Sequence, residues 1–544
     1  MSTRSIRDKL EKIVGTKLEH PENEDWGDWA AFLKPGKEAD GAVEKLKKLK
    51  FVEKVEQVGG FVNIRLKNEF FSTLLPQVIK NPGWGKSGVL RGKKVMVEFT
   101  DPNPFKELHI GHLYSNTVGE AISRLFEANG AVVKRACYQG DVGMHVAKAV
   151  WGMQAKIRNS KFEIRKTPKF LSEAYVLGAT AFEDNPEAAA EIKELNKKLY
   201  EAKSAEIMKL YELGKRESLI YFDGIYKRLG TKFDFSYFES DAGKRGMQVV
   251  EEGLGKGIFK KSEGAVIFEG EEFGLHTRVF VNSQGLPTYE AKELGLAPTK
   301  FADFPYDLSV IITANEINDY FRVLLKCLDL LYPDLAKRTK HIGHGFVKLP
   351  GAVKMSSRKG NVLTAEWLLD EAKKKVLEIA PKATDADAVG VAAVKYAMLR
   401  SGIGRDIEFD LDKSVSFEGS SGPYIQYTFA RTQSVLAKAD NSPLSFPSLK
   451  LREGPAVAEG ELNPEELAVL RWLYRWPEVI EEAGERLAPN LVCSFIYELA
   501  QRFNSFYAKH QILENEFRLA LTQATGQILK MGLEMLGIKA LEKM

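Results

Sequence analysis

Apolar residues follow a strand, helix, strand pattern between residues 94 and 138. The run KVMVEFT at 94–100 predicts a buried strand, and residues 110–129 carry an apolar stripe at helical spacing. Asn129-Gly130 predicts the end of that helix, and AVVKRACY at 131–138 predicts a second strand. The stripe consists of Val118, Ala121, Ile122, Leu125 and Phe126. This order of elements predicts the start of a doubly wound, Rossmann-like parallel sheet in an α/β domain.

The first 86 residues predict a small, separate α+β domain with one alternating strand after Gly59-Gly60. Its aliphatic positions are Val62, Ile64 and Leu66, and the positions between them hold Phe61, Asn63, Arg65 and Lys67. If the aliphatic side chains point inward, an aromatic ring, an amide and two cations face outward, which suits stacking on an unpaired base. A solvated strand with one incidental phenylalanine explains the same pattern, so both interpretations stay open.

Composition shifts divide the rest of the chain. The Gly- and Pro-rich segment NPGWGKSGVLRGKK separates the first domain from a parallel-sheet domain at 87–345. Residues from about 151 to 270 predict helices rich in Lys and Glu, which we interpret as an insertion. After it, the strand-like segments TRVFVNSQGLPTYEAK and DLSVIITA would complete the sheet. Residues 346–410 form a basic loop with a connecting segment, and 411–544 predict an all-α final domain.

Composition narrows the class of protein. With 44% hydrophobic and 28% charged residues the chain is typical of globular proteins, and a net charge of +4 neither demands nor excludes a nucleic acid. We expect a cytoplasmic protein without membrane contact, since no apolar run approaches ~20 residues and the N-terminus lacks an apolar signal segment. Cys137, Cys327 and Cys493 never stand in CxxC spacing, which argues against a disulfide framework and a structural zinc. They are expected to be buried free thiols.

The tetrapeptide His109-Ile110-Gly111-His112 stands where the first strand has ended and the helix begins. Backbone N–H groups and the helix dipole make such a position an anion site. The two histidines lie on one face of the first turn and could donate to triphosphate oxygens, while Gly111 lets a flat base approach the backbone. Two surface histidines without a ligand are the ordinary alternative.

The same string recurs as His341-Ile342-Gly343-His344. It continues into GFVKLPG, which predicts a strand and a turn with no helix to supply an N-terminus. We therefore assign the anion site to the first copy and a structural role to the second.

A basic loop, KMSSRKGN, occupies residues 354–361, and its cations are flanked by Gly351 and Gly360. A surface loop of this composition is ordinarily just solvated, but over an ATP site its cations could hold the leaving pyrophosphate. The two motifs follow one another about 240 residues apart, and their pairing is more specific than either alone.

In these motifs the chain resembles class I aminoacyl-tRNA synthetases and, within them, the arginyl-tRNA synthetase family. The first motif matches HIGH, and the second matches KMSKS except that Ser357 replaces the second lysine. In the family that loss goes with a lysine in the loop before HIGH, a place that Lys106 occupies. The resemblance implies the catalytic residues His109, His112, Lys106 and Lys354. It implies an ATP site formed by His109, Gly111, His112, Lys354, Met355, Ser356 and Arg358.

The resemblance also implies an arginine pocket. VEFTDPNPFKELHIGH is similar to the arginyl version of the first strand and loop, and PTYEAKE is similar to the segment with the substrate tyrosine. The implied pocket residues are Glu98, Asn103, Tyr289, Glu293 and Asn315. Glu293 stands where the family usually has Asp, and Asn315 where some members have Gln. In QGDVGMH, which resembles a GDWGTQ segment, Val142 and His145 replace Trp and Gln. A surface salt bridge is the ordinary alternative for each acid.

Two outer segments complete the resemblance. GPYIQYTFAR is similar to the opening helix of the anticodon-binding domain, and the GGFVNI strand to the domain that reads the tRNA elbow. The implied tRNA-binding residues are Phe61, Asn63, Tyr424, Tyr427 and Arg431. The last three share one helix face at i, i+3 and i+7, although core packing explains at least one tyrosine equally well.

The activity implied is ligation of L-arginine to tRNA-Arg through an arginyl-adenylate, with Mg²⁺ brought by ATP and no protein metal site. We expect a monomer whose partners are tRNA-Arg, L-arginine and ATP. A class I ligase for another amino acid is one alternative, which pyrophosphate exchange with each amino acid would distinguish. A noncatalytic tRNA-binding relative is the other, and the intact histidines and Lys354 argue against it.

Overall fold

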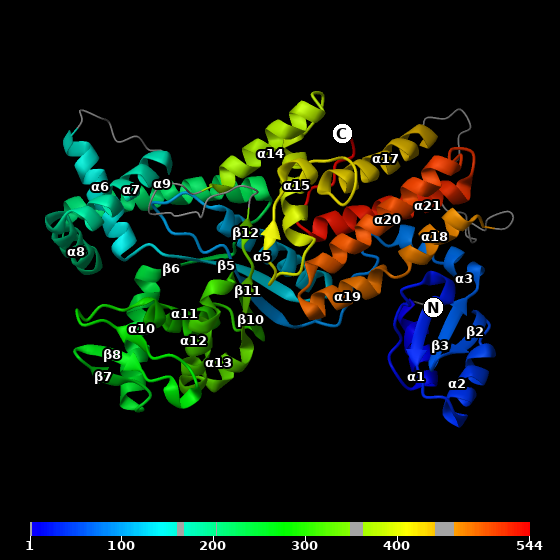
Figure 1. Ribbon diagram of the computed structural model, residues 1–544, viewed down its shortest axis with the longest axis horizontal. Helices are drawn as coiled ribbons and strands as arrows, with labels where there is room; N and C mark the ends of the chain where they lie inside the picture. The colour runs from blue at the N-terminus through cyan, green and yellow to red at the C-terminus, as the bar shows by residue number, and fades with distance from the viewer. Residues whose placement is uncertain (1–2, 160–167, 203, 349–362, 441–461) are drawn as a thin grey trace.

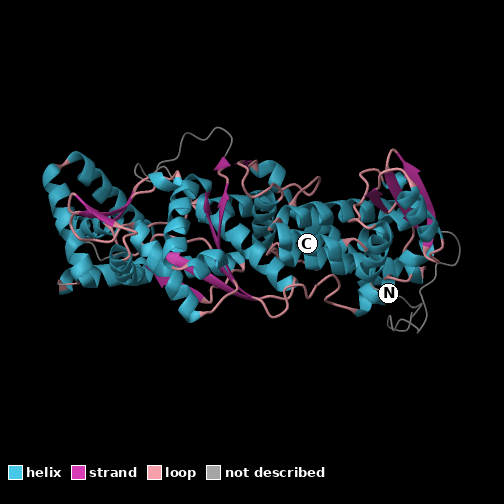
Figure 2. Ribbon diagram, turned by 90° about the horizontal axis from the view of Figure 1, so that it is seen from below, coloured by secondary structure: helices cyan, strands magenta, loops and turns pink. Residues whose placement is uncertain are grey.

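The computed structural model describes residues 3–159, 168–202, 204–348, 363–440 and 462–544. The molecule is elongated, with the N-terminal domain at one end and the helical insertion at the other (Figures 1 and 2). The predicted Lys354, Met355, Ser356 and Arg358 lie outside the described residues.

A five-stranded parallel sheet in the order β11-β10-β4-β5-β6 forms the centre of the molecule. The strands are β4 (Lys94–Glu98), β5 (Val132–Gln139), β6 (Phe235–Phe238), β10 (Leu308–Ala314) and β11 (Thr339–His344). Helix α5 (Ile110–Ala128) connects β4 to β5, and its apolar stripe is buried against the sheet. The predicted α/β core and the first strand, helix and second strand are confirmed.

Two predictions about the sheet are wrong. Strand β6 lies inside the segment predicted to be a helical insertion. The TRVFV segment forms β9 (Arg278–Val281), which pairs antiparallel with β8 (Ala265–Phe268) and not with the parallel sheet. β8 in turn pairs with β7 (Lys260–Ser262), so this short hairpin-like sheet satisfies the β9 backbone locally.

The insertion itself consists of α6 (Met144–Asn159), α7 (Pro168–Asp184), α8 (Pro186–Glu201) and α9 (Ala205–Leu229). Its separate core takes in Phe105 from the loop before α5. A Cβ on Gly214 would lie 2.0 Å from the Phe105 ring, so the ring sits directly on the α9 backbone. Ser218 Oγ also accepts the Phe105 N–H at 2.8 Å. The insertion therefore fixes the loop that leads into His109.

The remaining helices of the central domain lie on the sheet or connect it to the C-terminal part. They are α10 (Glu239–Gly255), α11 (Tyr289–Asp303), α12 (Asn318–Leu331), α13 (Pro333–Arg338), α14 (Ala365–Ile379) and α15 (Ala386–Leu399). Two short strands, β12 (Val347–Lys348) and β13 (Ile407–Glu408), pair in parallel beyond the end of β11.

The N-terminal domain is α+β, as predicted, with an antiparallel sheet in the order β1-β3-β2. Its elements are α1 (Thr3–Val14), β1 (Trp29–Phe32), α2 (Lys37–Lys47), β2 (Val52–Val58), β3 (Phe61–Leu66), α3 (Asn68–Ser72) and α4 (Leu75–Lys80). The aliphatic side chains of β3 are buried, but Asn63, predicted on an open face, is only 9% exposed. The segment Glu24–Trp26 covers that face, and Arg65 donates to the carbonyls of Glu24 and Asp25. Of the four residues predicted on that face, Phe61, 46% exposed, and Lys67 remain open.

The C-terminal domain is helical, as predicted. It consists of α16 (Leu411–Ser414), α17 (Gly422–Asp440), α18 (Pro464–Leu473), α19 (Trp476–Arg486), α20 (Pro489–Lys509) and α21 (Glu516–Met535). The N-terminal domain docks on it through partly buried charges. Arg502 pairs with Glu24 at 2.8 Å and Arg471 with Asp28 at 3.2 Å.

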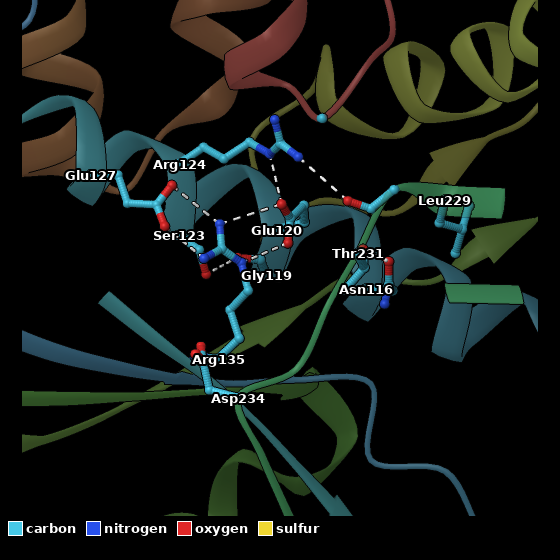
Figure 3. Close-up of polar contacts among 12 residues, drawn as sticks. Asn116, Gly119, Glu120, Ser123, Arg124, Glu127, Arg135, Leu229, Thr231 and Asp234 are labelled. Carbon is cyan, nitrogen blue, oxygen red and sulfur yellow. Dashed lines mark hydrogen bonds and ion pairs between the residues drawn. The ribbon is translucent and has the colours of Figure 1, made fainter. Parts of the chain in front are cut away.

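A buried polar cluster joins α5 to the C-terminal domain (Figure 3). Glu120 of α5 accepts from Arg124 and Arg135, and Arg124 also donates to the Glu534 carbonyl. Lys395 of α15 donates to the carbonyls of Leu229 and Gly537, and burial lowers its pKa to about 8. The helix that begins at His109 is therefore held at its far end by the insertion, α15 and the chain that follows α21.

The predicted buried free thiols are confirmed at Cys137, Cys327 and Cys493. In the described ranges, no group of three or more His, Cys, Asp or Glu side chains is arranged to hold a metal ion. Among the helices of the same ranges, none combines the length and the apolar character that a bilayer crossing needs.

Candidate active site

The first histidine pair caps the N-terminus of α5. His109 Nδ1 accepts the backbone N–H of His112 at 3.3 Å, and His112 Nδ1 accepts the backbone N–H of His109 at 3.2 Å. The two rings stack with centroids 3.6 Å apart. A side chain on Gly111 would meet the His109 ring at 2.9 Å, so glycine is what allows this close packing.

These contacts set the protonation of both rings. Because each Nδ1 accepts a hydrogen bond from the backbone, each neutral ring carries its proton on Nε2. Burial, and then the charge of Lys106, lowers the pKa of His109 to about 4. Burial, and then His109, lowers the pKa of His112 well below its usual value. At neutral pH the pair therefore consists of two uncharged Nε2–H donors at the positive end of a helix.

Lys106 lies close to this pair. Its Nζ is 4.1 Å from the centroid of the Tyr175 ring in α7, and its charge lowers the pKa of His109, His112 and His145. The loop that carries Lys106 has a left-handed Phe105 with φ of 70°, which the contacts with α9 hold in place.

Leu363 and Thr364 lie directly against the histidine pair. Leu363 O accepts the Ile110 N–H at 3.2 Å, and Thr364 forms a β-bridge with His109.

The second copy of the tetrapeptide forms most of strand β11 and caps no helix. His341 stacks on Phe321 with ring centroids 3.9 Å apart and hydrogen-bonds with Thr313 Oγ1 at 2.7 Å. His344 is buried at the strand end, where its ring lies 4.7 Å from that of Tyr114 in α5. Its charge would lower the pKa of both His109 and His112, so His344 borders the first copy while His341 faces away from it.

Acidic side chains gather at the carboxyl end of β4. Glu98, 1% exposed, forms an ion pair with Lys300 of α11 at 2.5 Å. Burial and the neighbouring Glu98 raise the pKa of Glu293, also on α11, to about 8. The same two causes raise the pKa of Asp101 well above its usual value. Glu98 and Glu293, two predicted pocket residues, therefore lie close together with Asp101, which the sequence analysis missed.

A second ion pair adjoins this cluster. Glu239 and Lys292 are both buried and 2.6 Å apart. A Cβ on Gly140 would meet both Asn103 Oδ1, at 2.3 Å, and Glu239 Oε1, at 3.2 Å, so Asn103 reaches the second pair. Tyr289, at the start of α11, has its ring centroid 5.1 Å from Lys292 Nζ.

The fifth predicted pocket residue, Asn315, follows β10 and packs beside Gly343 of β11. Because β10 pairs in parallel with β4, Asn315 stands at the same edge of the sheet as Glu98. The five residues thus lie near the carboxyl ends of the parallel strands, the location where open parallel sheets bind ligands.

The predicted tRNA-binding face of α17 is only partly exposed. Tyr427 is 42% exposed and has the guanidinium of Arg431 4.9 Å from its ring centroid. Tyr424 is half-buried, and its hydroxyl accepts from Asn504 at 2.9 Å. Tyr424 therefore contributes to packing within the helical domain, whereas Tyr427 keeps part of its ring exposed.

Two protein families match this chain. The catalytic domain of "tRNA synthetases class I (R)" matches residues 75–411, and the DALR anticodon binding domain matches residues 425–544. A parallel sheet with a histidine-capped helix is the core expected of a class I synthetase, and the chain belongs to the class I tRNA synthetases. Within that class the matching catalytic domain is the arginine type, which supports an arginine enzyme over a ligase for another amino acid.

Individual relatives agree with this assignment. Arginine–tRNA ligase of Treponema denticola is 31% identical, over 97% of this chain and 94% of the relative. Arginine–tRNA ligase of Streptococcus suis is 32% identical, over 97% of this chain and 95% of the relative.

Solved structures share the fold. Thermus thermophilus arginyl-tRNA synthetase superposes with a TM-score of 0.78 at 23% identity and covers 100% of both chains. The Plasmodium falciparum arginyl-tRNA synthetase has a TM-score of 0.75 at 18% identity, covering 100% of this chain and 99% of its own.

Proposed function

We propose that this chain joins L-arginine to tRNA-Arg in two steps, with ATP as the energy source and arginyl-adenylate as the intermediate. The observation that carries the proposal is an acid-lined site at the same sheet edge as two neutral histidine donors. The guanidinium group of arginine is planar, permanently charged and forked, so its binding site needs buried carboxylates. ATP needs donors and a helix N-terminus for its phosphates.

In the first step, the arginine carboxylate attacks the α-phosphorus of ATP and pyrophosphate leaves. The Nε2–H groups of His109 and His112 donate to phosphate oxygens as negative charge grows on them, and Lys106 adds a positive charge. Lys354, Met355, Ser356 and Arg358 complete the ATP site from the basic loop, and Mg²⁺ enters with the ATP phosphates. Positioning and charge stabilisation suffice for such a displacement, so no general base is assigned.

In the second step, a hydroxyl of the terminal ribose of tRNA attacks the mixed anhydride and AMP leaves. We assign the elbow of the tRNA to the N-terminal domain, residues 1–86, and the anticodon to the helical domain, residues 411–544. Phe61 and Tyr427 are the assigned contacts whose rings are exposed, whereas Arg431 is half-buried and donates to Asn504 Oδ1. Because one chain supplies both domains and the pocket, we propose that it works as a monomer.

The test of this function is ATP–pyrophosphate exchange with each amino acid in turn, with and without tRNA-Arg. Only arginine is expected to support exchange, and the family trait implies that exchange also requires the tRNA. Exchange with a different amino acid would contradict the assignment. Retained tRNA binding without exchange or charging would indicate a noncatalytic relative.

The raised pKa of Glu293 predicts a pH-dependent arginine affinity. With a pKa of about 8, the carboxyl is mostly protonated at pH 7, whereas the guanidinium binds the ionised form. One pH unit below its pKa about a tenth of a carboxyl group is ionised, and one unit above it about nine tenths. The KM for arginine should therefore fall about 10-fold as pH rises from 7 to 9. Glu293→Gln should raise the KM for arginine and remove this dependence, with little change in the KM for ATP.

The control for this prediction is Glu251→Gln, at an exposed position on α10. It keeps the pH dependence if the effect comes from the pocket. Equal pH profiles in wild type and Glu293→Gln would place Glu293 outside the arginine site.

Loss of either exposed ring should weaken the use of tRNA. Phe61→Ala and Tyr427→Ala should each cost about 1–3 kcal/mol in kcat/KM for tRNA if a base stacks there. Arginine and ATP parameters should not change. Tyr424→Ala is the comparison, because the loss of this half-buried, packed ring should lower Tm instead. A lowered Tm for Phe61→Ala or Tyr427→Ala at unchanged tRNA use would assign that ring to packing.

A further inference from the structure

A cavity of about 750 Å³ lies between the parallel-sheet domain and the helical domain, apart from the histidine pair. Three segments surround it: the outer edge of β11, the turn at residues 400–405, and the junction of α19 with α20. His341 of the second tetrapeptide lines the cavity, whereas His109, His112 and His344 do not.

The lining of this cavity is basic. Among the residues that the structure describes, no carboxylate lines it, and four cations do: Lys340, Arg400, Arg405 and Arg486. Arg486 pairs with Glu482 at an exposed site, and Arg400 donates to the Ser420 carbonyl. Within the described ranges, Lys340 and Arg405 form no ion pair with a carboxylate. At least two positive charges therefore face the cavity without a counter-charge from those ranges.

The backbone adds to this potential. Ala488 and Asn490, at the first turn of the 21-residue helix α20, line the cavity. No side chain caps that helix, so its positive end is open toward the four cations. A concave site with guanidinium groups, an ammonium group and a helix N-terminus matches the chemistry of a phosphate group.

The position of the cavity indicates which phosphate it would meet. The turn at 400–405 is tied to α5, because Ile403 O accepts from both Tyr114 Oη and the Gly345 N–H. The opposite wall belongs to the helical domain. A tRNA with its 3′ end at the histidine pair and its anticodon on the helical domain must cross the boundary between these domains.

We propose that this cavity is a phosphate-binding site for the sugar–phosphate backbone of the bound tRNA. The proposal rests on the proposed function, since it takes tRNA as the substrate. It names Lys340 and Arg405 as contacts that position the RNA without reading its sequence.

The test uses the full chain with Lys340→Gln and Arg405→Gln combined, and measures the Kd for tRNA-Arg from 50 to 200 mM salt. Each lost phosphate contact should reduce the slope of log K against log salt by about 1, so the double variant should lose about 2. The KM values for arginine and ATP should stay unchanged. Arg486→Gln, from the opposite wall, should lower the slope by about 1 independently.

The matched control combines Lys244→Gln and Lys337→Gln, two exposed lysines elsewhere on the sheet domain. It removes the same total charge, so an equal loss of slope in the control would overturn the proposal. Calorimetry with inorganic pyrophosphate separates the second source of phosphate. Pyrophosphate binding that the double variant loses, at unchanged tRNA affinity, would also overturn it. Failure of the wild-type chain to charge tRNA-Arg would instead contradict the proposed function.

Discussion

His112→Asn should lower kcat for arginyl-adenylate formation on the order of 100-fold, as the loss of one preorganised transition-state donor does in other enzymes. In the wild type, Nδ1 of His112 is occupied by the backbone and only Nε2–H is available to a phosphate. The asparagine carbonyl can replace Nδ1 as an acceptor for the helix but cannot reach the Nε2 position. The measurement is pyrophosphate exchange at saturating arginine, ATP and tRNA. His109→Asn should lower kcat in the same way. The helix should keep its N-cap in this variant, because Asn is a favourable N-cap residue.

The chain supplies its own control in the second copy of the motif. His341→Asn removes an imidazole from the same sequence context, but from a ring that stacks on Phe321 in β11. His341 also lines the proposed phosphate cavity, so the comparison is made at saturating tRNA, where kcat should be unchanged. His344 is a poorer control than the sequence suggested, because it packs against Tyr114 and lies in electrostatic reach of the first pair. If His341→Asn at unchanged Tm damages adenylate formation as much as His112→Asn does, the choice between the two copies is wrong.

The sequence predicted well those elements that are neighbours along the chain. β4, α5 and β5 follow one another within about 45 residues, and each has a pattern of its own period. The N-cap histidines could be recognised because they precede an apolar helical stripe. Burial of the stripe in the structure confirms that its period was interpreted correctly.

The errors concern pairing between distant segments. β6 is four residues long and is flanked by long helices, so its apolar pattern could not be separated from theirs. β9 has the alternation of a strand, but its partner is the nearby β8, and nothing in a period-2 pattern specifies a partner. The open face of β3 was mispredicted for a similar reason, since the Glu24 and Asp25 carbonyls that accept from Arg65 are remote in sequence.

The arginine pocket shows a further limit. The resemblance indicated Glu98 and Glu293, but not Lys300, which pairs with Glu98 from 202 residues away. The raised pKa of Glu293 depends on burial beside another carboxyl group, a property of the folded site that no motif carries.

Lys106→Ala should lower kcat for adenylate formation about 100-fold, with only a modest change in the KM for ATP. Ser357 stands where the synthetase motif has its second lysine, so another cation has to offset the charge that grows on the phosphates. Lys106 is three residues before His109, and its charge already depresses the pKa of both capping histidines. An effect in the transition state, and not on ATP binding, is expected because that charge appears only as the bond to pyrophosphate breaks.

A second readout separates this role from a merely structural one. Removal of the Lys106 charge should raise the pKa of His109 above about 4, while burial, the larger cause, still holds it below its ordinary value; an NMR titration of the imidazole can follow the change. Lys106→Arg should keep both the low pKa and part of the rate. Lys148→Ala is the matched control, because Lys148 lies 4.1 Å from the Phe182 ring centroid, the same distance as Lys106 from Tyr175. It should reproduce any loss of stability without the loss of kcat, and full activity in Lys106→Ala would refute the compensation for Ser357.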